Sequence, residues 1–199
     1  MSDLMNPAVL LRMARDTVSN PREGAAAIVK LQLPPRALWL AFALVMVLSM
    51  ILGEAVAIWM GPPPESAMGD SVMVSPVTMG VLQAGFLFLV AHGMARIGRL
   101  FGGTGDFQGA LALVVWLQFI FLLVQIVQLV AMVIVPPMAG LITILAMGLF
   151  FWLLVNFIAT LHGFSSLGMI FLVTILTALG FIFVLSLALT MVGVGFGIS

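Results

Sequence analysis

Residues 109–160 contain no charged side chain, and this feature most constrains how the chain folds. One transmembrane helix needs about 20 mostly apolar residues, so the block is long enough for two. Pro136 and Pro137 lie near its middle. Adjacent prolines end a helix because they lack amide donors and clash with the preceding turn. The block therefore predicts a hairpin of two helices, 109–135 and 138–160, and the alternative is one kinked helix followed by a re-entrant segment.

Three further apolar segments bring the number of predicted spans to five: 37–60, 77–95 and 167–191. The chain of 199 residues is 63% hydrophobic and only 7% charged, whereas soluble domains carry roughly a quarter charged residues. Disorder is excluded because so apolar a chain collapses. We predict an all-α fold, a multi-pass transmembrane helical bundle of five spans. Residues 1–36 are an N-terminal segment, 37–192 the membrane domain, 193–199 a short tail, and 61–76, 96–108 and 161–166 the main loops.

The N-terminal segment predicts two short helices. Asn6-Pro7 and Asn20-Pro21 each place a favoured N-cap residue before a proline at the first helical position. Glu23 lies three residues after Asn20, which suits a capping box. Two placements stay open for these helices. They lie among the lipid headgroups as amphipathic interfacial helices, or they pack across the ends of the bundle.

All seven lysine and arginine residues fall on one side of the predicted topology. Because these residues collect in cytoplasmic segments, the N-terminus is predicted inside and, with five spans, the C-terminus outside. The expected location is a bacterial cytoplasmic (inner) membrane. Near an anionic membrane surface each basic residue contributes about 1 kcal/mol to binding. The candidate contacts for anionic lipid are Arg12, Arg15, Arg22, Lys30, Arg36, Arg96 and Arg99.

Few polar side chains fall inside the predicted spans, and an ionisable one is costly there. Glu54 lies near the outer end of the first span, at the depth that Gln128 has in the third. With no basic residue on the outer side, Glu54 must be protonated, face water or hydrogen-bond a side chain such as Gln128. A proton or cation site and a polar helix–helix contact both stay open. The candidate intramembrane polar site comprises Glu54, Gln83, Gln118, Gln125, Gln128 and Asn156.

Three of these glutamines recur in the third span at steps of seven and three residues, which predicts a polar stripe on one helical face. Gln83, Asn156 and Thr160 are expected to face it from the neighbouring spans. Such side chains join membrane helices by about 0.6–2 kcal/mol per contact. The alternative is that they line an aqueous path.

Motifs for catalysis or cofactor binding are missing from the sequence. Cysteine is absent, and the two histidines, His92 and His162, are far apart, so no metal site is expected. The glycines of 102–105 lack the Lys-Ser/Thr of a phosphate-binding loop. The formal net charge is zero, so there is no basic excess for nucleic acid. We expect no enzyme, no cofactor and no nucleic-acid partner.

Three segments carry a family resemblance. NPREGAAAIV precedes the first span as a proline-started amphipathic segment. Residues 95–116, ARIGRLFGGTGDFQGALALVVW, form a basic–glycine–aromatic loop that leads into the third span. HGFSSLGMI, residues 162–170, forms the turn into the fifth. In this order, and over roughly residues 5–190, they resemble the Yip1 domain family in its bacterial form. The chain differs from eukaryotic members in having no tyrosine.

The resemblance implies a five-span integral membrane protein that acts without catalysis, as a scaffold or adaptor. Eukaryotic members of the family are linked to vesicle trafficking and membrane shaping. The expected partners are membrane lipids and other membrane proteins, or further copies of the chain. The rival hypothesis is a small proton- or cation-coupled transporter or channel that uses Glu54 and the glutamine stripe. The absence of a clear internal repeat counts against it, since transport folds often contain repeats.

Overall fold

The computed structural model describes residues 6–60 and 76–191, and these residues form seven helices and no strand. The predicted all-α fold is confirmed for this part of the chain. Of the predicted loop 61–76, residues 61–75 lie outside the described residues and Pro76 begins α4, and the predicted tail 193–199 also lies outside them. Two short helices come first, α1 (Pro7–Ser19) and α2 (Pro21–Lys30). Five long helices follow: α3 (Pro35–Met60), α4 (Pro76–Leu100), α5 (Phe107–Ile134), α6 (Pro136–His162) and α7 (Leu167–Met191).

Four of the described helices, α3 to α6, are long and apolar enough to cross a membrane. In α7 the apolar stretch that the structure describes, Leu167–Gly180, is shorter than a full span. The membrane bundle is therefore established with four candidate spans, and the fifth stays a prediction.

The second long helix extends further than its hydropathy predicts. α4 continues to Leu100, so Arg96 and Arg99 lie on its last turns instead of in a loop. Basic side chains suit this position because they interact favourably with the C-terminal end of the helix dipole. The connection to α5 is shortened to residues 101–106. The turn at 161–166 is shortened in the same way, since α6 includes His162.

The two prolines divide the long apolar block as predicted. α5 ends at Ile134, α6 begins at Pro136, and only Val135 lies between them. Proline is tolerated at the first helical position because an amide there would have no intrahelical acceptor. The Val135 amide still donates to the carbonyl of Ala131 at 2.7 Å and closes α5. The structure is a helical hairpin, not one kinked helix with a re-entrant segment.

The two predicted N-terminal helices are present, but only one has the predicted cap. Asn6 accepts a hydrogen bond from the amide of Ala8 through its side chain at 3.0 Å. Asn20 makes no side-chain cap, so the capping box predicted with Glu23 is wrong. The reason is that Asn20 also ends α1, where its own amide donates to the carbonyl of Asp16 at 2.8 Å.

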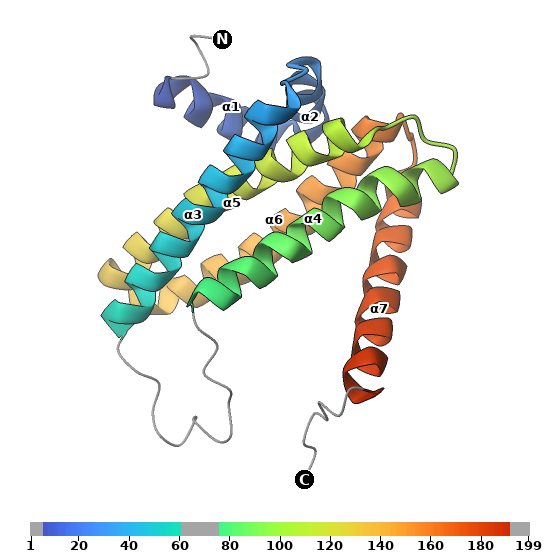
Figure 1. Ribbon diagram of the computed structural model, residues 1–199. Helices are drawn as coiled ribbons and strands as arrows, with labels where there is room; N and C mark the ends of the chain where they lie inside the picture. Colours follow the sequence, from blue (N-terminus) through green and yellow to red (C-terminus); the bar gives the residue numbers. More distant parts are fainter. Residues whose placement is uncertain (1–5, 61–75, 192–199) are drawn as a thin grey trace.

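The N-terminal pair packs across one end of the bundle, where α2 contacts α5 and α6 (Figure 1). Its inner face is buried through Thr17 on α1 and through Ala25 and Ile28 on α2. Of the two placements left open by the sequence, the inner face of these helices therefore adopts the second, packing across the end of the bundle.

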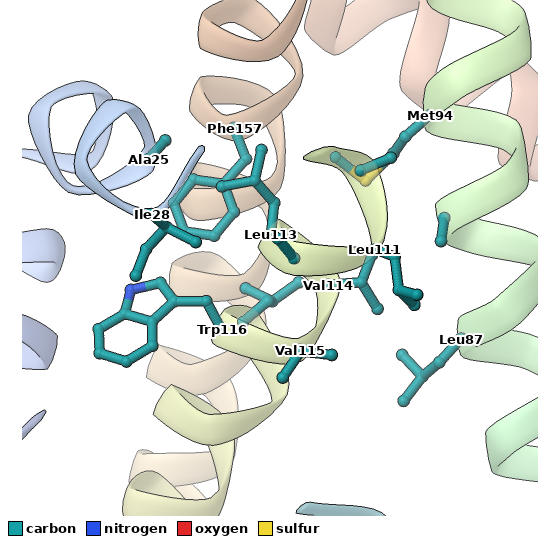
Figure 2. Packing of buried hydrophobic residues seen from close by; sticks show 14 of the residues in the cluster. Ala25, Ile28, Leu87, Met94, Leu111, Leu113, Val114, Val115, Trp116 and Phe157 are labelled. Carbon is teal, nitrogen blue, oxygen red and sulfur yellow. The ribbon is translucent and has the colours of Figure 1, made fainter. Parts of the chain in front are cut away.

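The core is built around the first half of α5, which packs against α3, α4 and α6. Its side chains point in several directions (Figure 2): Trp116 lies toward Ile28 of α2, and Leu111 toward Leu87 and Met94 of α4. α7 packs mainly against α6 and diverges from the rest of the bundle (Figure 1).

Candidate functional site

All seven lysine and arginine side chains are exposed and gather at one end of the bundle. They lie on α1, on α2, on the first turn of α3 and on the last turns of α4 (Figure 1). The described acidic side chains at this end are fewer: Asp16, Glu23 and Asp106. We call this end of the bundle the basic end. It comprises Arg12, Arg15, Arg22, Lys30, Arg36, Arg96 and Arg99.

A buried histidine lies beneath the basic end. His162 is 3% exposed, and its Nδ1 accepts a hydrogen bond from the amide of Gly105 at 3.1 Å. Its Nε2 lies 2.8 Å from the carbonyl oxygen of Met94. Because Nδ1 accepts, the neutral tautomer with the proton on Nε2 satisfies both contacts. The ring also stacks on Phe164 at 5.6 Å between centroids. One imidazole therefore joins α4, the 101–106 connection and the end of α6.

Three glycines make room for this ring. A Cβ atom placed on Gly98, Gly103 or Gly105 would overlap the His162 side chain. The glycine-rich segment thus has a packing reason in this structure: only residues without a side chain let the backbone approach the imidazole so closely.

Two basic residues are also structural. Arg99 donates from Nε to the carbonyl of Gly105 at 2.8 Å, which holds the short connection against α4. Arg22 donates from Nη2 to the carbonyl of Ser165 at 3.3 Å, which ties α2 to the turn before α7. The basic end is therefore linked by hydrogen bonds to the loops that it covers.

A buried polar contact fixes the N-terminal pair to the core. The indole Nε1 of Trp116 donates to Thr17 Oγ1 at 3.1 Å, and Thr17 in turn donates to the carbonyl of Met13 at 2.7 Å. Gly24 of α2 lies so close to Thr17 that a Cβ atom there would overlap its side chain. A second link joins Gln108 to the carbonyl of Leu33 at 2.7 Å.

The glutamines of α5 do not share one partner helix. Gln118 donates to Ser49 Oγ on α3 at 3.1 Å, whereas Gln128 donates to Thr143 Oγ1 on α6 at 2.7 Å. Ten residues separate them by about 15 Å along the helix but only about 80° around it, so they can lie on one broad face and still meet different neighbours. Each of these two glutamines joins a different pair of helices.

The contact between Glu54 and Gln128, one of the possibilities that the sequence left open, is not formed. Glu54 is half-buried on α3, and no hydrogen bond or ion pair joins it to another residue in the part of the chain that the structure describes. Gln125 is half-buried with its amide beside Gly53, and Gln83 is exposed on α4. The structure does not bring the candidate polar residues together into one site.

The remaining polar side chains of the spans bond to carbonyls of their own helix or contact phenylalanine rings. Asn156 is buried and donates to the carbonyl of Trp152 at 2.8 Å, and Thr160 donates to the carbonyl of Asn156 at 2.9 Å. Such back-bonding within a helix needs no partner on a neighbouring helix. His92 is exposed, with its ring 5.8 Å from Phe88 and 5.5 Å from Phe107.

The residues that organise the basic end were not singled out from the sequence. Neither His162 nor Thr17 belongs to a sequence motif that would predict its tertiary partner. The available signal was the pair of segments 95–116 and 162–170, which meet where His162 is enclosed by glycines.

An apolar helical bundle with one basic end defines the class, an integral membrane protein. The model of the Yip1 domain matches residues 15–188, so the chain belongs to the Yip1 domain family. Among curated proteins and solved structures, none matches the chain.

Proposed function

We propose that this protein is a non-enzymatic membrane scaffold or adaptor whose basic end faces the cytoplasm. The observation that carries the proposal is the structure of that end. A two-helix unit is fixed to the bundle by the Trp116–Thr17 hydrogen bond and by the burial of Ala25 and Ile28. Its basic side chains remain exposed. A surface with a fixed shape and an excess of positive charge suits the binding of partners rather than the conversion of a substrate.

The topology that follows has five spans, with α7 as the fifth and the C-terminus outside. α7 is 25 residues long, and its short connection to α6 leaves from the basic end. Because lysine and arginine collect on the inner side, we place the protein in a bacterial inner membrane with α1 inside. A reporter fused after Ser199 should be active only outside the cytoplasm. Activity of a cytoplasmic reporter at that position would overturn the topology.

Anionic lipids are the first partners that this surface favours. The side chains of Arg12, Arg15, Lys30 and Arg36 form no hydrogen bond or ion pair with any residue that the structure describes. Their charges are therefore available to a lipid surface or to an acidic protein. Beneath α1 an apolar hollow of about 460 Å³ lies against α5 and α6, which suits a helix held at the boundary between headgroups and acyl chains.

The direct test is extraction of the protein in native nanodiscs, followed by mass spectrometry of everything retained. A stoichiometric protein partner that is lost when Arg12, Arg15, Lys30 and Arg36 are replaced by glutamine would support the adaptor role. Glu54→Gln is the control, because it changes one charge away from the basic end. Recovery of only lipid and copies of the chain would overturn the adaptor role.

The rival transporter receives less support. Its candidate residues are dispersed, and Gln118 and Gln128 are each engaged with a neighbouring helix. In proteoliposomes we expect proton flux equal to that of protein-free vesicles. Flux that wild type supports and Glu54→Gln abolishes would favour the transporter instead.

A further inference from the structure

An apolar groove lies between α4 and α7, on the side where α7 diverges from the bundle (Figure 1). Its volume is about 680 Å³, which lies within the usual range of small-molecule sites, about 300–1,000 Å³. α6 forms its floor, since α4 and α7 both contact that helix. Most of its walls are apolar and come from all three helices: Phe86, Leu89, Phe151, Leu154, Ile170 and Val173.

One end of the groove is polar. Arg96, on the last turns of α4, lines it together with Ser165 and Ser166 from the turn before α7. Both of these elements belong to the end of the bundle where the basic residues gather. Among the residues that the structure describes, no aspartate or glutamate lines the groove.

Arg96 differs from the two structural arginines nearby. The donors of Arg22 and Arg99 are used by backbone carbonyls of the chain. No described residue accepts a hydrogen bond from the Arg96 guanidinium or pairs with its charge. An exposed cation at the head of a groove without acidic residues is complementary to an anion, and guanidinium groups bind phosphate strongly.

We propose that this groove binds one anionic phospholipid. Its phosphate lies at Arg96 with the two serine hydroxyls, and an acyl chain lies along the apolar walls of α4 and α7. We choose a phospholipid because the groove has a charged group at the membrane surface and then a long apolar path. A phospholipid has the same order, with a charged headgroup followed by apolar acyl chains. The site does not depend on the scaffold role, since a lipid can bind there whether or not a protein partner binds at the basic end.

The test uses the full-length protein in phosphatidylcholine nanodiscs that contain a trace of phosphatidylglycerol with a photoreactive acyl chain. After irradiation, mass spectrometry maps the labelled peptides. We expect labels to concentrate on residues 86–97 and 169–178. The exposed face of α3 near Leu44 and Ile51 reports ordinary contact with bulk lipid. Equal labelling of that face and the groove would overturn the proposal.

Two matched pairs of variants sharpen the test. Arg96→Gln should lower labelling of the groove about fivefold, which corresponds to about 1 kcal/mol per basic residue. Arg96→Lys keeps the positive charge at the same position and should retain most of the labelling. Ala178→Trp should reduce it by filling the groove, whereas Leu179→Trp, on an exposed neighbour that does not line the groove, should not.

Three results would contradict the site. Labelling that does not respond to Arg96→Gln would exclude recognition of the phosphate by that arginine. Equal labelling by a photoreactive phosphatidylcholine would exclude selection of an anionic headgroup. Cross-links between two copies of the chain across α4 and α7, in place of lipid adducts, would assign the groove to self-association.

Discussion

The α5–α6 hairpin has two ends, one at the basic end of the bundle and one at the Val135 turn. Both are similarly apolar in sequence, but they differ in burial. In α5, every residue from Gly109 to Leu117 is buried, and none from Gln125 to Ile134 is. α6 shows the same division, because its buried residues lie between Leu153 and His162. Hydropathy therefore identifies a segment that enters the membrane, but it does not say which part of that segment faces protein and which faces lipid.

The difference follows from what covers each end. At the basic end α2 and the 101–106 connection pack over the hairpin, and His162 and Thr17 supply buried hydrogen bonds. At the opposite end the hairpin is joined by the contact between Gln128 and Thr143, which is partly exposed. Substitutions at the basic end should therefore cost more stability than equivalent ones at the other end.

The largest effect is expected for His162→Ala. The change removes both hydrogen bonds of a nearly fully buried ring and leaves a cavity among the glycines. We expect a loss of about 3–5 kcal/mol in the free energy of unfolding, measured by titration with a denaturing detergent in mixed micelles. His92→Ala is the matched control, because it removes an exposed imidazole. Similar losses in the two variants would show that the burial of His162 contributes little to stability.

A second test adds one methyl group in place of removing a ring. Gly98→Ala places a Cβ atom against His162 and should lower the free energy of unfolding by about 1–3 kcal/mol. Gly85 lies on the same helix with no atom near its Cβ position. Gly85→Ala should be neutral or slightly stabilising, since alanine is the better helix former. A neutral Gly98→Ala would show that the histidine site is loosely packed.

The hydropathy of segments about 20 residues long predicted most of the fold, because it depends only on residues that are close together in the chain. Pro136 marked the hairpin, and Pro7 and Pro21 marked the two N-terminal helices. The candidate site was less predictable. The side chains that Trp116 and Gln118 contact, Thr17 and Ser49, are far away in the chain, and only tertiary packing brings them together.

The contact between the N-terminal pair and α5 should give an intermediate effect. Thr17→Val keeps the volume of the side chain but removes the acceptor of the Trp116 indole. A buried donor left without a partner costs about 1–3 kcal/mol, and the same loss is expected in the free energy of unfolding. Trp116 emission should shift as its environment changes. Ser19→Ala, at an exposed position of the same helix, is the control. If Thr17→Val leaves both readouts unchanged, α1 is not held by this hydrogen bond.

The smallest effects compare two glutamines of one helix. Gln118→Leu leaves the buried hydroxyl of Ser49 without its donor, and we expect a loss of about 1–2 kcal/mol. Gln128→Leu should cost about 0.6 kcal/mol or less. Its partner Thr143 still donates to the carbonyl of Ala139 at 3.0 Å, so no polar group is left without a partner.

The detergent titration used for His162 measures both variants, and the ratio of their losses is the informative quantity. Equal losses in the free energy of unfolding for Gln118→Leu and Gln128→Leu would mean that the lipid-facing part of the hairpin is held as firmly as the covered part. A larger loss for Gln128→Leu would reverse the comparison, because a partly exposed contact would then hold the hairpin more firmly than one beside the buried core.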